Sequence, residues 1–304
     1  MKLSVIFPTY NRPKDLKIAL DSLLEQKLLP FETIVVDQSD NDLTKKLCSE
    51  NEYKKIWIKY IYSDCKSAPK AKEIWMDSID DKVWWFLFFD DDVKLMPNFL
   101  DEVSKFLESV PSALWWGWKI LNYPIEKSFF QDMWHLLFRN KFISWCYWTL
   151  DAQYKHPDKI QNVTDMIWCD VFFRRDVKDK WYRFVDWIKW SGHAEETFFQ
   201  YQIYKDYPNS LFYLPTAEVY HYEVPTYKWP RFQQVFFHRY VFWKKYNFAM
   251  RKYYWRTFGY FMLQFIKNKN KFELLKLYLK TMKQIRQHKK EIIENPNIIR
   301  ELIG

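Results

Sequence analysis

The sequence predicts an α/β fold in which a mostly parallel sheet is flanked by helices, followed by a helical C-terminal extension rich in basic and aromatic residues. Short apolar runs alternate with helical patterns over roughly the first 120 residues, which is typical of βαβ units. Beyond Pro225 the pattern is helical to the end. We therefore expect a first domain over residues 1–225 and an extension over 226–304.

The expected elements follow from hydrophobic periodicity and from helix start signals such as Pro13. The predicted strands of the first domain are Lys2–Phe7, Glu32–Asp37, Ile56–Tyr62, Trp84–Phe89, Ala113–Lys119, Met166–Phe173 and Ala217–His221. The predicted helices are Pro13–Gln26, Leu43–Glu50, Pro69–Ile79, Asn98–Glu108 and one that opens at Glu195. The irregular aromatic stretch over residues 121–165 is interpreted as a substrate-facing insertion.

The net charge of +9 is distributed unevenly along the chain. Residues 226–304 hold 18 Lys and Arg against 4 Asp and Glu, so the extension carries about +14 and the first 225 residues about −5. Such asymmetry favours an anionic partner for the extension, either phospholipid or nucleic acid. Because no nucleic-acid recognition motif accompanies the charge, we expect an anionic membrane surface and no nucleic acid.

The cysteines and the first residues bear on the compartment. Cys48, Cys65, Cys146 and Cys169 are widely spaced, so they indicate neither a disulfide framework nor a zinc site. The apolar run that follows Met1 is too short for a signal peptide. We expect a cytoplasmic protein.

Three polar segments follow predicted strands, where an open parallel sheet places its ligands. They are Pro8–Arg12, Asp37–Asp42 and Asp90–Asp92. Adjacent carboxylates repel one another unless a cation lies among them, so the third segment favours a Mg²⁺ or Mn²⁺ site. The first two also fit simple turns that cap a helix, and the third fits a solvated acidic turn.

The order of these segments resembles the family-2 glycosyltransferases of the GT-A fold. The resemblance is carried by Ser4–Arg12, Ile34–Asp37, Phe88–Val93, Cys169–Arg175, Ala194–Phe199 and Val219–Glu223, and it covers roughly residues 2–225. It implies a metal-dependent enzyme of the glycosyltransferase class that moves a sugar from a nucleoside diphosphate sugar, with inversion, to a lipid-linked or polysaccharide acceptor. A UDP-sugar is the favoured donor, and GDP- and dTDP-sugars are alternatives.

The same resemblance implies roles for individual residues. Nucleotide binding is implied for Pro8, Thr9, Tyr10, Asn11, Arg12, Asp37, Lys72, Asp90 and Asp91. The resemblance implies that Asp90 and Asp92 form the Asp-x-Asp motif that holds Mn²⁺ or Mg²⁺, and that His221 completes the metal site or contacts the diphosphate. Of the pair Glu195 and Glu196, we expect Glu196 to be the base that removes the acceptor proton. A carboxylate in the first turn of a helix also simply complements the helix dipole.

The sequence departs from the family pattern at several positions. Lys72 stands where Arg is usual, and Trp75 and Trp168 stand where Gly is usual. If glycine at these two positions lets the backbone approach the ligand closely, the indoles of Trp75 and Trp168 fill the ligand pocket. This leaves a catalytically silent nucleotide- or glycan-binding scaffold on the membrane as the alternative function. A nucleotidyltransferase is less consistent with the sequence, because no Gly-rich loop follows the first strand.

The extension interleaves aromatic and basic residues over 229–266, and a helix over Phe272–Ile293 has the apolar stripe Phe272, Leu275, Leu279, Met282 and Ile285. Interfacial helices have this composition. No uncharged run approaches the ~20 residues of a membrane span. We expect the chain to lie peripherally on the inner face of the cell membrane. Alternatively, the stripe packs on the first domain or on another subunit.

Overall fold

The computed structural model describes residues 2–65, 68–122, 159–162, 170–180, 182–183, 185, 195–222 and 229–303. The chain divides into two compact units. The first comprises Met1–Phe184 and Phe199–Val224, and the second comprises Val185–Phe198 and Pro225–Gly304.

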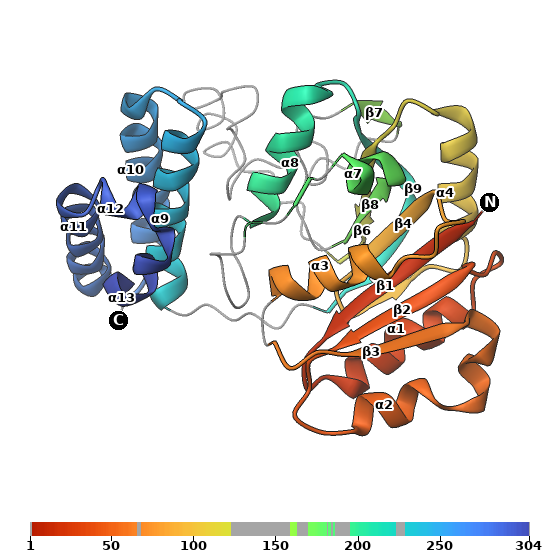
Figure 1. Ribbon diagram of the computed structural model, residues 1–304. Coiled ribbons are helices and arrows are strands. Elements are labelled where there is room, and N and C mark those ends of the chain that lie inside the picture. The colour runs from red at the N-terminus through yellow and green to blue at the C-terminus, as the bar shows by residue number, and fades with distance from the viewer. Residues whose placement is uncertain are drawn as a thin grey trace. The chain divides into compact units, whose positions relative to one another are not determined.

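The described strands of the first unit form one sheet with the order β3-β2-β1-β4-β8-β6-β9-β5, and β7 pairs with β9 (Figure 1). Their bounds are β1 Leu3–Thr9, β2 Glu32–Asp37, β3 Ile58–Tyr62, β4 Trp85–Phe89, β5 Val93–Leu95, β6 Trp115–Ile120, β7 Gln161–Asn162, β8 Asp170–Arg174 and β9 Leu211–His221. β3, β2, β1 and β4 run parallel, and β8 joins β4 antiparallel. The expected α/β class, with a sheet flanked by helices and a helical C-terminal part, is confirmed.

Helices cover both faces of this sheet, so side chains on successive strand positions enter two separate cores. In β1, Val5 and Phe7 lie in one core and Ile6 in the other. The first core is closed by α1 (Pro13–Leu24), α2 (Leu43–Cys48) and α4 (Phe99–Ser109). The second is closed by α3 (Ala68–Ser78), α7 (Arg175–Asp179) and residues of α8 (Glu195–Asp206). Figure 1 shows α3 on the opposite side of the parallel strands from α1 and α2.

Trp75 lies in the second core. Its side chain is fully buried, and its ring contacts Phe86, Phe88 and Phe173 at centroid distances of 5.6, 5.5 and 6.5 Å. The expectation that an indole at position 75 fills a ligand pocket is therefore wrong, because the Trp75 side chain packs between α3 and the sheet. Trp168 lies outside the described residues, as does most of the predicted insertion over 121–165.

Several element boundaries differ from the prediction. The strand predicted from Ile56 begins at Ile58, because a 3₁₀ helix, η1 (Asn51–Ile56), precedes it and Trp57 turns the chain with a φ of 47°. β9 begins at Leu211 rather than Ala217. β5 was not predicted, since three residues are too few to show a strand period.

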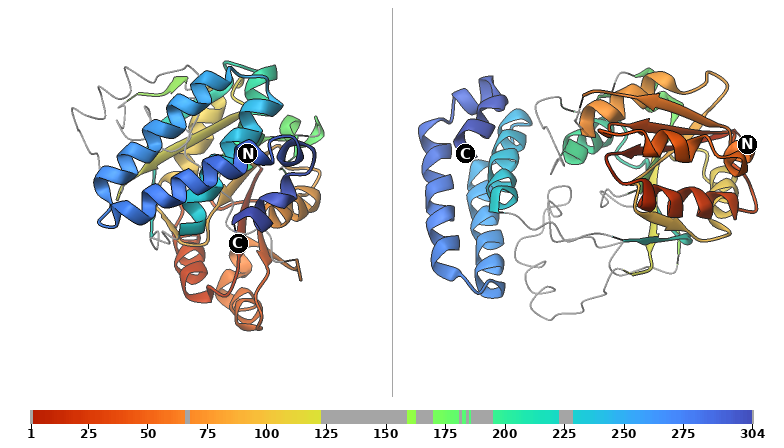
Figure 2. Two further views of the ribbon diagram at one scale, coloured as in Figure 1. Left: turned by 90° about the vertical axis from the view of Figure 1, so that its left-hand side faces the viewer. Right: turned by 90° about the horizontal axis from the view of Figure 1, so that it is seen from below.

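The second unit is helical. It contains α9 (Trp229–Lys245), α10 (Met250–Lys267), α11 (Lys271–Gln287), α12 (Glu291–Glu294), η2 (Pro296–Ile298) and α13 (Ile299–Ile303). α9 packs against α10, α11, α12 and α13, and α10 packs against α11 (Figure 2). The single helix predicted over Phe272–Ile293 is wrong, since α11 ends at Gln287 and α12 begins at Glu291.

The aromatic residues of this unit form its core. Nine of the fourteen aromatic residues from Phe232 to Phe261 are buried, namely Phe232, Phe236, Phe237, Tyr240, Phe242, Trp243, Tyr253, Tyr260 and Phe261. The rings pack on one another, as Phe236 does on Tyr260 at 5.7 Å. Their interfacial assignment is therefore wrong, because the helices bury these rings against each other. Tyr254 and Trp255 remain exposed.

None of the helices in the described ranges is long and apolar enough to cross a bilayer.

Candidate active site

The turns after β1 and β2 are joined to each other by side chains. In-register pairing of the two parallel strands places Thr9 opposite Asp37. Asn11 Nδ2 donates to Asp40 Oδ2 at 2.9 Å, and the Asp40 backbone N–H donates to Asn11 Oδ1 at 3.0 Å. Asn11 has a φ of 56°, a left-handed conformation that Asn tolerates better than most residues. The hydrogen bonds fix the turn in this conformation.

The acidic turn after β4 is joined to the β1 turn by Arg12. Arg12 Nη1 donates to Asp91 Oδ1 at 2.8 Å, and Nη2 donates to Asp92 Oδ2 at 2.9 Å. The Thr9 hydroxyl donates to Asp91 Oδ2 at 2.7 Å. Asp91 and Asp92 are both buried. One guanidinium thus holds two buried carboxylates, which its planar set of donors allows.

The environment separates the pKa values of these two carboxylates. Burial raises the pKa of Asp91 to about 7, although Arg12 and Thr9 oppose the shift. Burial also acts to raise the pKa of Asp92, but His221 and Arg12 outweigh it and hold that pKa below its ordinary value. The Arg12 pKa is raised, since Asp91 and Asp92 outweigh its burial. Asp92 is accordingly a carboxylate at neutral pH.

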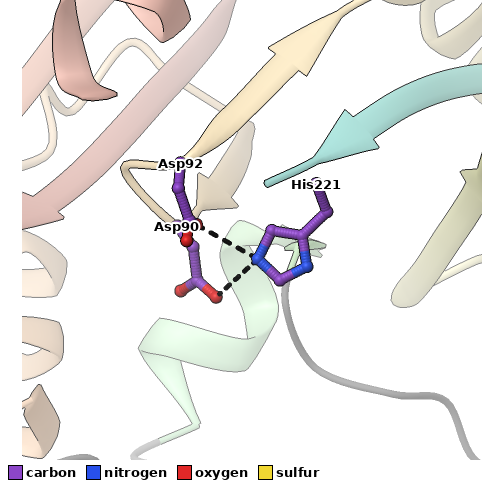
Figure 3. A group of neighbouring side chains, drawn as sticks. All are labelled: Asp90, Asp92 and His221. Carbon is purple, nitrogen blue, oxygen red and sulfur yellow. Dashed lines mark hydrogen bonds and ion pairs between the residues drawn. The ribbon is translucent and has the colours of Figure 1, made fainter. Parts of the chain in front are cut away.

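His221 completes a group with Asp90 and Asp92 (Figure 3). The antiparallel pairing of β5 with β9 sets His221 opposite Val93. His221 Nε2 lies 3.1 Å from Asp92 Oδ1 and 3.7 Å from Asp90 Oδ2. One ligand atom from each residue lies within 4.8 Å of the others. Residues 129 positions apart meet at one point because β9 returns beside the acidic turn.

This donor set fits a divalent cation. Two carboxylates and one imidazole suit Mn²⁺, and carboxylates with substrate phosphates suit Mg²⁺. Asp92 Oδ2 already accepts from Arg12, so Oδ1 is the oxygen that faces His221. The side chains of Asp90, Asp92 and His221 could therefore hold Mn²⁺ or Mg²⁺.

Asn122 is a residue of this group that the sequence analysis missed. Its Nδ2 donates to the His221 carbonyl at 2.7 Å, and the His221 backbone N–H donates to Asn122 Oδ1 at 3.0 Å. These two bonds fix the backbone at the end of β9. The signal available in the sequence was a polar residue just after the predicted strand Ala113–Lys119.

Asp37 lies next to these turns but is fully buried. The Tyr60 hydroxyl donates to Asp37 Oδ2 at 2.8 Å, and the Ser39 backbone N–H donates to Oδ1 at 2.9 Å. Both carboxylate oxygens of Asp37, which the sequence predicts to bind the nucleotide, thus accept hydrogen bonds from the protein.

The structure brings most of the expected site residues to one edge of the sheet. Pro8 and Thr9 end β1, and Tyr10 is 44% exposed. Lys72 lies in α3, and its side chain is outside the described part of the structure. Glu195 and Glu196 begin α8, and their side chains are likewise not described.

Comparison with known proteins identifies the family. The family model for glycosyl transferase family 2 matches residues 4–181, which contain the β1 and β4 turns and more than half of the chain. The chain belongs to glycosyl transferase family 2. The match confirms the resemblance found in the sequence.

One curated relative of this family 2 member is an uncharacterized glycosyltransferase of Haemophilus influenzae, 29% identical over 111 residues. The matched segment covers 36% of this chain and 36% of the relative, so it spans about a third of that protein's length.

Solved structures of S. aureus TarS resemble this family 2 member in fold. TarS 1–349 has a TM-score of 0.57 at 17% identity, and the match covers 99% of this chain and 90% of that one. TarS 1–349 in complex with UDP-GlcNAc has a TM-score of 0.52 at 19% identity, covering 78% and 65% of the two chains. TarS 1–349 in complex with UDP has a TM-score of 0.55 at 17% identity, covering 99% and 90%. These likenesses support the GT-A fold.

Proposed function

We propose that this family 2 member is an inverting, metal-dependent glycosyltransferase that takes its sugar from a nucleoside diphosphate sugar. The observation that carries the proposal is the meeting of Asp90, Asp92 and His221 at the carboxyl end of the sheet. A parallel sheet binds nucleotides at this end. Binding of UDP-GlcNAc and UDP by TarS, which has the same fold, favours a UDP-sugar over a GDP- or dTDP-sugar.

In this proposal, the turns after β1 and β2 hold the nucleoside. Pro8, Thr9, Tyr10 and Asn11 line the first turn, and Asp37 begins the second. The Asn11–Asp40 hydrogen bonds give the two turns one fixed geometry before the nucleotide arrives. Such preorganisation reduces the entropy that binding costs. Lys72 supplies a further cation for the phosphates.

Asp90, Asp92 and His221 would hold Mn²⁺ or Mg²⁺ beside the diphosphate. The bound cation supplies Lewis-acid stabilisation of the diphosphate leaving group. Arg12 pairs with both Asp91 and Asp92, and together His221 and Arg12 keep Asp92 ionised. Three adjacent aspartates can then coexist at a buried strand end.

Glu196 is the proposed base, with Glu195 as its neighbour at the start of α8. Its carboxylate takes the proton of the acceptor hydroxyl while the acceptor oxygen bonds to the anomeric carbon. The bond from that carbon to the diphosphate oxygen breaks, and the nucleoside diphosphate leaves. Attack opposite the leaving group inverts the configuration.

We further propose that residues 1–225 are the transferase domain and that residues 226–304 hold the enzyme on the cytoplasmic face of the membrane. The acceptor is then a lipid-linked saccharide or a growing polysaccharide at that surface. The excess of basic residues in the extension supports this assignment.

The proposal is tested by the melting temperature of the protein with Mn²⁺ or Mg²⁺ and each of UDP, GDP, CDP and dTDP. A bound ligand stabilises the native state by about 2.7 kcal/mol at 100 times its dissociation constant. We expect stabilisation by UDP that needs the metal and is absent in Asp92→Ala. The matched control is Asp101→Ala, an acidic residue on α4 whose ion pair with Lys105 is exposed.

Stabilisation by one nucleotide, lost only in Asp92→Ala, supports the site and names the donor for turnover assays. No response by a folded protein to any nucleotide argues against the transferase. Nucleotide binding without turnover on any donor and acceptor favours the catalytically silent scaffold.

A further inference from the structure

The exposed side of α10 is apolar along most of its length. Trp255, Phe258 and Ile266 are 55%, 44% and 68% exposed. Their spacing of three and eight residues places them within one sector of the helix. At 1.5 Å per residue this stripe is about 16 Å long. The buried rings of Tyr253, Tyr260 and other residues occupy the opposite side.

α11 repeats the arrangement. Phe272, Leu275 and Leu279 are 75%, 37% and 57% exposed and fall within one sector of the helix. Leu274, Met282 and Ile285 are buried. The predicted stripe on this helix is therefore split, since Met282 and Ile285 belong to the core. Ile266 and Phe272 lie at the ends of α10 and α11, on either side of the short connection 268–270.

Basic residues surround both stripes. Between positions 250 and 290 the sequence has twelve Lys and Arg and one acidic residue, Glu273. Lys269, Lys271, Lys276, Lys280 and Lys283 are exposed. Exposed apolar stripes flanked by lysines combine insertion into the acyl boundary with attraction to anionic headgroups.

The positive charge of this surface distinguishes a second copy of the chain from an anionic membrane as the partner that covers it. A second copy would bring an equally basic surface against it, and like charges across an interface are unfavourable. A bilayer with acidic phospholipids offers both an apolar interior and a negative surface. We propose that the α10–α11 hairpin is the membrane-docking surface, with Ile266 and Phe272 inserting at its tip and the lysines of α11 binding anionic headgroups. This inference specifies the surface by which the proposed transferase meets its membrane.

The test is sedimentation of the full chain with vesicles of phosphatidylcholine alone or with added phosphatidylglycerol. We expect binding only to the anionic vesicles, weakened by salt. Two double variants, Ile266→Ser with Phe272→Ser and Lys276→Glu with Lys280→Glu, should each bind at least about tenfold more weakly. Trp57→Ser is the matched control, because Trp57 is 74% exposed in the first unit. Circular dichroism confirms that the variants are folded.

Four results would overturn the inference: no binding by the parent, equal loss in Trp57→Ser, unchanged binding by the Ile266 and Phe272 variant, or self-association that this variant abolishes. The last would make the surface an interface between copies. Nucleotide stabilisation measured on the same samples separates this inference from the proposed function. Vesicle binding should persist in Asp92→Ala, and stabilisation by UDP and Mn²⁺ should persist in the hairpin variants.

Discussion

Arg12 and Asp92 are joined by a 2.9 Å ion pair that ties the turn after β1 to the acidic turn after β4. The same guanidinium binds Asp91 at 2.8 Å, whereas its third partner, Asp15, is a half-exposed residue of α1. The two buried carboxylates depend on this cation, because an unpaired buried charge is costly.

Arg12→Ala should lower the free energy of unfolding by on the order of 2–3 kcal/mol, since it removes the guanidinium that binds both buried Asp91 and Asp92. Arg12→Lys should lie between the parent and Arg12→Ala, because an ammonium group cannot bind both carboxylates with a planar fork. Urea denaturation measures both. The control is Asp15→Ala, which removes only the exposed partner and should cost less than about 1 kcal/mol. Equal stability of Arg12→Ala and Asp15→Ala would contradict the bridging role.

Asn11→Ala and Asn11→Gly should differ in stability. Both lose the hydrogen bonds with Asp40, but Gly accepts the φ of 56° without strain. We expect Asn11→Gly to be more stable than Asn11→Ala by about 1 kcal/mol. Chemical denaturation measures this difference in stability. The UDP affinity of both variants shows whether the connection between the turns after β1 and β2 affects nucleotide binding. Indistinguishable variants would show that the left-handed backbone at position 11 carries no strain.

Trp75→Phe should be tolerated, whereas Trp75→Gly should not. Among the described residues, no hydrogen-bond partner faces the buried Trp75 Nε1, so a phenyl ring loses contact area alone. We expect a cost below about 1.5 kcal/mol for Phe. Removal of the ring should cost at least about 3–5 kcal/mol, and Gly weakens the helix further. Thermal melting compares the two. If Trp75→Gly were more stable than Trp75→Phe, the indole would lie outside the core.

The ion pair between Arg174 and Asp176 should make stability depend on acid pH. Burial alone would raise the pKa of Asp176, but Arg174, at 2.7 Å, outweighs it and lowers the pKa below 3.8. A depressed pKa stabilises the fold above the unfolded-state value, and this stability is lost as the pH falls through the folded-state value. Asp176→Asn should therefore lower the free energy of unfolding by about 1 kcal/mol or less at pH 7. At the lowest pH, where Asp176 is protonated, the substitution should not change it.

Urea denaturation of Asp176→Asn and the parent between about pH 7 and pH 3 measures this convergence. Asp179→Asn is the control, since Asp179 is 56% exposed and lies 3.6 Å from Arg175. A difference between Asp176→Asn and the parent that stays constant with pH would rule out the ion pair as its source.

Glu196→Gln should slow transfer strongly while UDP and Mn²⁺ still stabilise the protein, because an amide cannot take the acceptor proton. Glu195→Gln should retain more activity. Loss of a general base typically costs about 10²–10⁴-fold in rate. Turnover of the UDP-sugar and the melting shift are measured on the same preparations. Full activity in Glu196→Gln together with loss in Glu195→Gln would exchange the two roles.

Local patterns in the sequence predicted the fold class and most of the parallel half of the sheet. β2 was predicted with its observed bounds, and β1, β4 and α4 within one or two residues. A buried strand between helices shows a continuous apolar run, and both ends of that run are visible in the residues themselves. The short strand β5 and the 3₁₀ helix η1 lack such a period.

The sequence by itself determined the α/β fold, the family and the acidic turn Asp90–Asp92, because each depends on neighbouring residues. Only the tertiary structure decided that Arg12 binds the acidic turn and that Asn122 fixes His221 beside it. It also decided that Trp75 and the α9 residues Phe232, Phe236 and Phe242 form core, while Trp255, Ile266 and Phe272 face outward. These relationships join residues distant in the chain, and burial depends on what the folded chain places opposite each side chain.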